Sequence, residues 1–196
     1  MIIDIDTIKD KYRNYTNIFE KVKVEEKNKR LFKIKRSLYS DSITEHPFLI
    51  ANVLYSPSYI SFETALSFYN MIPERVDLIK SATFQKNKSK LYENIYGKFY
   101  FQDVNKNAYP FGIDTINIDG IDIFIASREK ALLDTISIKP PVKNLYEIKS
   151  LLFDDMRLNN YIFDELDKNV LINLSKLYSS QNCKIFKKLL ERIKHD

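Results

Sequence analysis

The sequence IDTINIDGIDIFI, residues 113–125, is the stretch that decides most about the fold. Two runs of alternating β-branched and polar residues lie on either side of the dipeptide Asp119-Gly120. A type I′ turn requires positive φ at both of its central residues, and an Asp-Gly pair meets that requirement. The stretch therefore predicts a tight β-hairpin with strands over residues 113–118 and 121–125.

Helices and further strands are expected around this hairpin. Ser127 is a suitable N-cap for a helix that directs Ala131, Leu132 and Thr135 inward. The double proline at residues 140–141 then interrupts the chain, and only helical patterns follow it. The predicted helices cover residues 48–54, 62–70, 128–136, 145–156, 161–166, 171–178 and 184–193, and two more strands cover residues 76–83 and 98–102.

The first forty residues have a different pattern. Asp4 or Asp6 can cap a helix that runs through Tyr12, and Asn17 begins a second helix. Apolar and basic residues then alternate over residues 31–39, which predicts a β-hairpin with a basic tip. Helix, helix and basic hairpin is the order of a winged helix-turn-helix.

The predicted fold class is therefore α+β. An N-terminal winged helix-turn-helix is followed by a mixed α/β domain with a C-terminal helical region. Residues 1–40 are expected to bind DNA, residues 40–45 to form a polar linker, and residues 46–196 to form the second domain.

The position of the charge supports a polyanion partner. The chain of 196 residues has a formal net charge of +5, and residues 1–40 alone hold eleven basic and six acidic residues. The rest of the chain is therefore neutral. A concentrated basic segment is the electrostatic footprint of nucleic acid binding, although a solvated lysine-rich face has the same composition.

A second basic segment lies at the other end of the sequence. It is either a second phosphate-contacting face or a set of cations placed favourably near helix C-termini. The second interpretation is favoured unless the fold brings this segment beside the N-terminal one. Its members are Lys184, Lys187, Lys188, Arg192 and Lys194.

Composition excludes several classes of protein. Three glycines cannot form a phosphate loop or a dinucleotide fingerprint, and two histidines with one cysteine cannot build a Cys/His zinc site. No cofactor or metal is expected. No apolar run approaches the roughly 18 residues needed to cross a bilayer, the start lacks a basic leader segment, and a lone cysteine suits a reducing compartment. We expect a cytoplasmic protein without membrane contacts.

Enzyme function is the alternative class. Asp114, Asp119 and Asp122 lie close together with Asp134, and paired carboxylates hold Mg²⁺ in nucleases and nucleotidyltransferases. The first three also suit the polar positions of a hairpin, so the structural explanation is preferred and a metal-dependent nuclease or nucleotidyltransferase remains the alternative. His46 is interpreted as a linker residue and Cys183 as a small filler at the start of the last helix.

The predicted DNA contacts follow from the winged-helix interpretation. The helix from Asn17 is expected in or near the major groove. The basic ribbon, which contains Lys29, Arg30, Lys33, Lys35 and Arg36, is expected to contact the DNA backbone or the minor groove. A domain this small offers few base contacts, so two copies are expected on an inverted repeat of double-stranded promoter DNA. The candidate DNA-binding residues are Asn17, Lys21, Lys23, Lys27, Lys29, Arg30, Lys33, Lys35 and Arg36.

Several segments, in this order, resemble the AbiEi family of antitoxins. The basic stretch at residues 29–40 is similar to the wing of that family, with Ser37 where the family usually has glycine before the sequence (Val/Leu)-Tyr. The other segments are similar to the entry into the family's second domain and to its strand-to-helix segment. They are residues 50–51, 57–61, 64–66 and 125–134.

The resemblance implies a function in bacterial phage defence by abortive infection. Members of the family bind the promoter of their own operon through the winged helix and repress it. Their second domain opposes a nucleotidyltransferase-like toxin without a stable toxin–antitoxin complex. The resemblance thus implies an antitoxin and negative autoregulator with no catalytic activity of its own.

Overall fold

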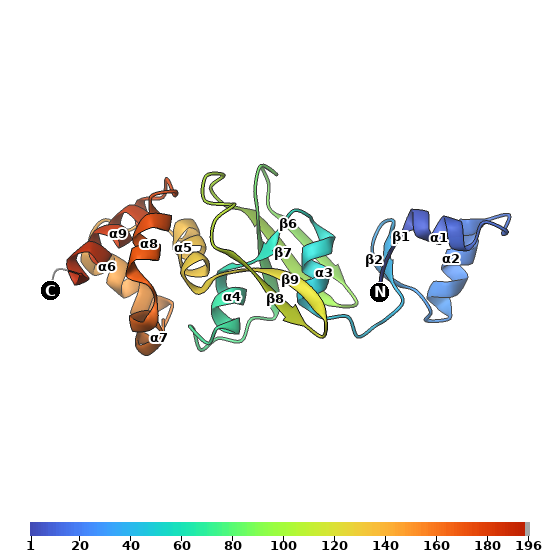
Figure 1. The fold of residues 1–196 in the computed structure, drawn as a ribbon, viewed down its shortest axis with the longest axis horizontal. Coiled ribbons are helices and arrows are strands. Elements are labelled where there is room, and N and C mark those ends of the chain that lie inside the picture. The colour runs from blue at the N-terminus through green and yellow to red at the C-terminus, as the bar shows by residue number, and fades with distance from the viewer. Residues whose placement is uncertain (195–196) are drawn as a thin grey trace.

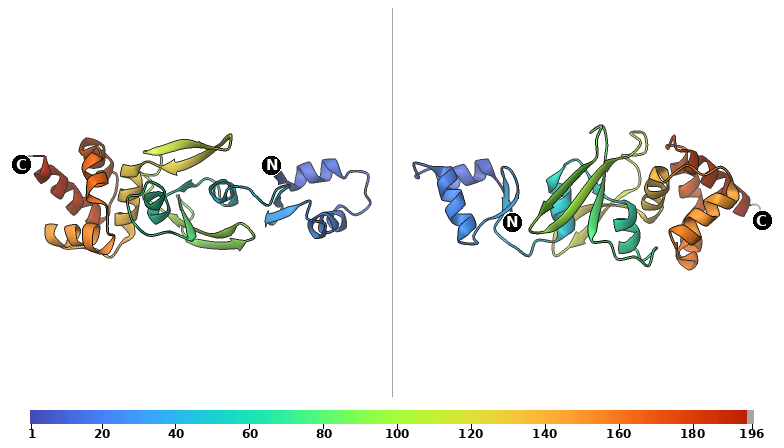
Figure 2. Two further views of the ribbon diagram at one scale, coloured as in Figure 1. Left: turned by 90° about the horizontal axis from the view of Figure 1, so that it is seen from below. Right: turned by 180° about the vertical axis from the view of Figure 1, so that it is seen from behind.

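The computed structural model describes residues 1–194, and its parts follow one another along one long axis. An N-terminal unit lies at one end, a curved β-sheet with helices lies in the middle, and a bundle of helices lies at the other end (Figures 1 and 2). The protein is a mixed α+β protein, as predicted. Within residues 1–194, no helix combines the length and apolar character needed to cross a membrane.

The N-terminal unit has the element order β-α-α-β-β. Asp4 accepts a hydrogen bond from the backbone N–H of Thr7 and Asn17 one from that of Glu20, so both predicted caps are confirmed. Strand β1, which pairs with β3 in a three-stranded antiparallel sheet of order β1-β3-β2, was not predicted. The elements are β1 (Ile2–Asp4), α1 (Ile5–Lys11), α2 (Ile18–Lys27), β2 (Phe32–Lys35) and β3 (Leu38–Ser40).

This unit has a small core of its own, made of Ile3, Ile8, Val22, Leu31 and Tyr39. Helix α1 contributes Ile8 and α2 contributes Val22, and these two side chains pack with Ile3 and Tyr39 of the sheet. The partly buried Ile5, Tyr12 and Ile18 pack against this core. The segment that follows, residues 41–46, contains no helix or strand.

The central sheet has six strands in the order β6-β7-β5-β4-β9-β8. The pairs β5–β7 and β4–β9 are parallel and the other three are antiparallel, so the sheet is mixed. Helix α3 packs against β4, β5 and β9, and α4 packs against β5 and α5. The strands are β4 (Tyr59–Ile60), β5 (Leu78–Thr83), β6 (Lys90–Asn94), β7 (Gly97–Asp103), β8 (Ile113–Ile118) and β9 (Ile121–Ala126), and the helices are α3 (Pro47–Leu54), α4 (Phe62–Phe68) and α5 (Arg128–Ile138).

The hairpin predicted from residues 113–125 is confirmed. Asp119 and Gly120 have φ of 53° and 81°, as a type I′ turn requires, and Ile118 pairs with Ile121 beside the turn. The short strand β4 and strand β6 were not predicted. Strand β4 has two residues, which are too few to show alternation. Strand β6 begins at Lys90, and the lysines around that residue suggested an exposed connection.

The C-terminal helices pack against α5 and share one continuous core with the sheet. The helix predicted over residues 145–156 is divided into an α-helix and a π-helical turn, which lets Met156 bond back to the carbonyl of Leu151. The elements are α6 (Leu145–Ser150), the π turn η1 (Leu151–Asp155), α7 (Asn160–Glu165), α8 (Lys168–Ser175) and α9 (Gln181–Ile193).

Candidate functional site

Helix α2 supplies the first of the predicted DNA contacts, and not all of them are available to a ligand. Lys21 was expected to face outward, but its Nζ lies 2.6 Å from Oε1 of the buried Glu25 and its side chain is 19% exposed. Its ammonium group also lies 4.9 Å from the ring centre of Tyr15. The bond from Lys21 lowers the pKa of the Glu25 carboxyl, so Lys21 stabilises the unit, and its role as a DNA contact stays a prediction.

The exposed face of α2 contains both basic and apolar side chains. Lys23 is exposed and pairs with Glu20 at 2.7 Å, and Lys27 is exposed one turn further on. Phe19 and Val24 are 65% and 47% exposed on the same helix. Sequence reasoning missed these two residues because an apolar residue in a short helix is normally assigned to the core.

The ribbon and the loop before it present further cations. Lys29, Lys33 and Arg36 are exposed, and Arg30 lies 3.6 Å from Glu25 across an exposed surface. Ser37 has φ of 65°, the left-handed conformation that glycine adopts without strain. This is the position at which the resemblance described above places a glycine.

Lys35 also has partners within the protein, because it points toward the rest of the chain. Its Nζ donates to the carbonyl oxygens of Leu54 at 2.7 Å and Val53 at 3.3 Å, at the C-terminal end of α3. Burial lowers the pKa of this ammonium group, and Lys90 lowers it further. Lys35 therefore joins the ribbon to the C-terminal end of α3, a position at which the helix dipole favours a cation.

Two further hydrogen bonds cross the same junction. The Asn94 side-chain amide donates to the carbonyl of Ile34 at 3.0 Å, and the Tyr96 hydroxyl donates to the carbonyl of Ser42 at 2.6 Å. The inner side of the ribbon is thus held by the second part of the chain. The cations that stay accessible lie on its outer side and on α2.

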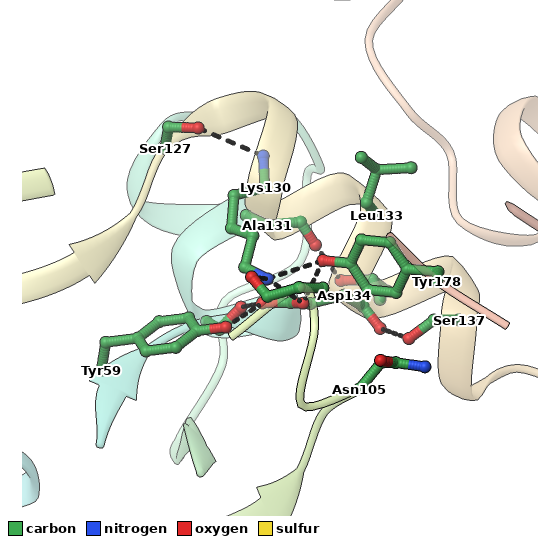
Figure 3. A network of polar contacts seen from close by, with 12 residues as sticks. Tyr59, Asn105, Ser127, Lys130, Ala131, Leu133, Asp134, Ser137 and Tyr178 are labelled. Atoms are coloured by element: carbon green, nitrogen blue, oxygen red, sulfur yellow. Dashed lines mark hydrogen bonds and ion pairs between the residues drawn. The ribbon is translucent and has the colours of Figure 1, made fainter. Parts of the chain in front are cut away.

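A buried polar network at the opposite side of the sheet is the densest cluster of ionisable groups (Figure 3). Asp134 of α5 accepts hydrogen bonds from Tyr178 at 2.6 Å, Ser61 at 2.7 Å and Tyr59 at 2.9 Å. Lys130, one turn earlier, lies 3.2 Å from the same carboxylate. All three donors on the Lys130 ammonium are used, because it also bonds to Tyr178 at 2.8 Å and to the carbonyl of Ala108 at 2.7 Å.

This network stabilises the fold, and its charged pair is closed to solvent. Lys130 and Asp134 are completely buried. Burial lowers the pKa of Lys130, whereas burial and the charge of Asp134 raise the pKa values of Tyr59 and Tyr178. Sequence reasoning grouped Asp134 with a possible metal cluster and overlooked Lys130, although the spacing of four residues on one helix was a usable signal for a pair.

The aspartates of the alternative enzyme hypothesis do not converge. Asp119 forms the hairpin turn, Asp122 accepts a hydrogen bond from Asn117 at 2.8 Å, and Asp114 is exposed farther along β8. In residues 1–194, no group of three or more histidine, cysteine, aspartate or glutamate side chains is arranged to hold a metal ion. The geometry therefore gives no support to a nuclease or nucleotidyltransferase site here.

The remaining candidates also have structural explanations. His46 caps α3 by accepting a hydrogen bond from the N–H of Phe48 at 3.1 Å. Cys183 is buried, and burial raises the pKa of its thiol to about 12, which is the opposite of an activated nucleophile.

A cavity of about 730 Å³ lies between α3 and the β8–β9 hairpin. The side-chain amide of Asn52, at the edge of the cavity, makes two hydrogen bonds with the backbone of Phe124. Its oxygen accepts from the N–H of Phe124 at 2.7 Å, and its nitrogen donates to the carbonyl of Phe124 at 3.3 Å. This amide thus pairs within the protein and is not free for a ligand.

Comparison with known proteins adds no relative. No protein-family profile matches the sequence, and no curated protein sequence matches it significantly. The functional argument therefore depends on the geometry of the chain itself and on the motifs described above.

Proposed function

We propose that this protein is the antitoxin of a bacterial abortive-infection system and that it represses its own promoter. The observation that carries the proposal is the concentration of the whole excess charge on one small unit with its own core at one end of the molecule. A basic unit of this kind is suited to the phosphates of double-stranded DNA.

In this proposal, residues 1–40 act as a short winged helix-turn-helix. Helices α1 and α2 take the place of the helix-turn-helix, and the β2–β3 hairpin takes the place of the wing. The positive φ of Ser37 supports the likeness to the antitoxin wing, because a turn of that shape explains a glycine at this position.

The proposed contacts are the predicted ones without Lys21 and Lys35. Phosphates are contacted by exposed cations on α2, the following loop and the ribbon. Asn17 uses its side-chain oxygen on its own helix cap, so only its amide nitrogen is available to a base. Phe19 and Val24 are placed to meet thymine methyl groups if α2 enters the major groove. The phosphate-binding residues are Lys23, Lys27, Lys29, Arg30, Lys33 and Arg36.

The second part of the chain opposes a nucleotidyltransferase-like toxin without forming a stable complex, and the protein has no enzymatic activity. These points rest on the resemblance alone. Two copies are expected on an inverted repeat, since one small unit offers few base contacts.

Binding to the protein's own promoter tests the first half of the proposal. Binding to promoter and scrambled duplexes is measured by fluorescence anisotropy between 50 and 200 mM salt. Replacing Lys33 and Arg36 with alanine should reduce the slope of log K against log salt by about 1.8, because each lost phosphate contact contributes about 0.9. Lys88→Ala/Lys106→Ala, which removes two exposed cations elsewhere, is the matched control.

Equal binding to both duplexes would refute promoter recognition, and an unchanged slope would remove the ribbon from the interface. Co-expression with the toxin of the same operon tests the second half. Rescue of growth without co-elution on a sizing column is the expected result, whereas a stable complex would contradict the proposed mechanism.

A further inference from the structure

The basic segment near the C-terminus lines a groove in the C-terminal helical bundle. The bundle lies at the end of the molecule opposite the N-terminal unit (Figures 1 and 2). The groove has a volume of about 420 Å³ and lies between α9 and the residue Lys143 that precedes α6. Four lysines line it and only one carboxylate, that of Glu191, is present. The lining residues are Lys143, Gln181, Lys184, Ile185, Lys187, Lys188 and Glu191.

The interpretation of these lysines as cations at a helix C-terminus is wrong for three of them. Lys184 lies in the first turn of α9, Lys187 and Lys188 lie in its middle, and of the basic residues only Arg192 is in its last turn. The first turn of α9 contains no acidic residue. The helix dipole therefore gives these three charges little stabilisation, and like charges close together favour an anionic ligand.

Few of the charges are neutralised within the protein. In the part of the chain that the structure describes, Lys143, Lys184 and Lys188 form no ion pair, and Lys187 approaches Glu191 only to 3.4 Å. One further carboxylate lies close by, because Glu147 of α6 accepts a hydrogen bond from the backbone N–H of Lys143 at 2.7 Å, but the four lysines still outnumber Glu147 and Glu191. The groove thus keeps an excess positive charge.

A buried asparagine holds the two sides of the groove together. Asn182 is 1% exposed, and its amide group donates to the carbonyls of Ile136, Lys139 and Pro140 at 2.9–3.1 Å. Its oxygen accepts from the N–H of Val142 at 2.8 Å. These hydrogen bonds fix the loop between α5 and α6 against α9, and the fold therefore sets the position of Lys143.

We propose that this groove binds a single strand of nucleic acid through its phosphodiester backbone, separately from the N-terminal unit. Lys184 and Lys188 are four residues apart on α9, about 6 Å along its axis, so neighbouring phosphates can be contacted. A groove of this size admits a single strand, whereas a duplex is too wide to enter it. No aromatic side chain lines it, so binding should depend little on base sequence.

The test uses the full chain and a fluorescein-labelled U12 oligonucleotide in anisotropy titrations. Lys184→Gln/Lys188→Gln removes two groove cations from exposed helix positions and keeps helix propensity. Each lost contact to a single strand contributes about 0.7 to the salt slope, so the slope should fall by about 1.4 and affinity about tenfold at 150 mM salt. Binding to promoter DNA should not change.

Two variants serve as controls. Lys88→Gln/Lys106→Gln changes the net charge equally at exposed positions outside both basic surfaces, and Lys33→Gln/Arg36→Gln alters the N-terminal unit. Both should keep U12 affinity within about twofold. Thermal melting confirms that each variant folds.

Five outcomes would overturn the proposal. The first is unchanged U12 affinity in Lys184→Gln/Lys188→Gln. The second is an equal loss of U12 affinity in the Lys88→Gln/Lys106→Gln control, and the third is a loss of U12 affinity only in Lys33→Gln/Arg36→Gln. The fourth is displacement of U12 by a glutamate decamer as effectively as by unlabelled U12, which would assign the groove to an acidic protein partner. Tighter binding of a 12-base-pair duplex to the groove would refute the single-strand assignment.

Discussion

Breaking the buried pair between Lys130 and Asp134 is the most informative perturbation of the fold. Asp134→Asn keeps the side-chain shape but removes the negative charge that faces the Lys130 ammonium at 3.2 Å. The ammonium then lies at a completely buried position without a counter-charge. Removing one partner of such a pair costs about 3–5 kcal/mol, which is a large fraction of the stability of a typical domain.

The hydroxyl groups around Asp134 add to this cost. Tyr59, Ser61 and Tyr178 all donate to the carboxylate. The amide nitrogen of an asparagine cannot accept a hydrogen bond, so at least one of these donors loses its partner, at about 1–3 kcal/mol. We expect Asp134→Asn and Lys130→Met each to destabilise the protein by at least about 3 kcal/mol.

The double variant distinguishes a charge effect from a packing effect. Lys130→Met/Asp134→Asn leaves no unpaired charge and should be more stable than either single variant, because the cost of an isolated buried ion disappears. Glu191→Gln is the matched control, since it breaks an exposed pair of the same spacing with Lys187 and should change stability by less than about 0.5 kcal/mol.

Urea unfolding followed by far-UV circular dichroism measures these differences. With an m value of up to about 3 kcal/mol per M, a loss of 4 kcal/mol lowers the midpoint by at least about 1.3 M. Single variants within about 1 kcal/mol of the parent, or a double variant that shows the sum of both losses, would refute the reasoning.

Two further predictions concern Lys35 and Glu63. Lys35→Met removes both hydrogen bonds to the end of α3 and should cost about 1–2 kcal/mol in urea unfolding, without changing the salt slope of promoter binding, whereas a reduced slope would return Lys35 to the interface. Glu63 lies 2.9 Å from both Lys80 and Lys139. Burial alone would raise its pKa, but the two ammonium groups outweigh burial and lower the pKa from 4.5 to about 2. Because the folded-state pKa is the lower one, the stabilisation is complete above about pH 5 and is lost as pH falls toward 2. After allowance for partial exposure it amounts to about 2 kcal/mol. Glu63→Gln should remove that part of the pH dependence, and a parallel pH profile for parent and variant would contradict this assignment.

Local patterns in the sequence were sufficient for most helices and for the main hairpin. The Asp-Gly turn at residues 119–120 and the caps Asn17 and Ser127 depend on neighbouring backbone groups only, so they could be predicted from a few residues. The charge excess of the first forty residues was also available from counting alone.

The strand pairing depended on distant parts of the chain. Strand β4 contains only Tyr59 and Ile60, and it is a strand because it lies between β5 and β9. Two residues have no periodicity of their own, so only tertiary pairing could define them.

The direction of the long cationic side chains was the other property that the sequence left open. The sequence does not distinguish three inward-facing lysines from the exposed ones. In the structure, Lys21 faces Glu25, Lys35 faces the end of α3 and Lys130 faces Asp134. A lysine becomes buried only where packing brings an acceptor to its ammonium group, and those acceptors lie on other elements for Lys35 and partly for Lys130. The separation of the two basic surfaces to opposite ends of the molecule was likewise decided by the tertiary structure, because charge along a sequence does not specify where the folded chain places it.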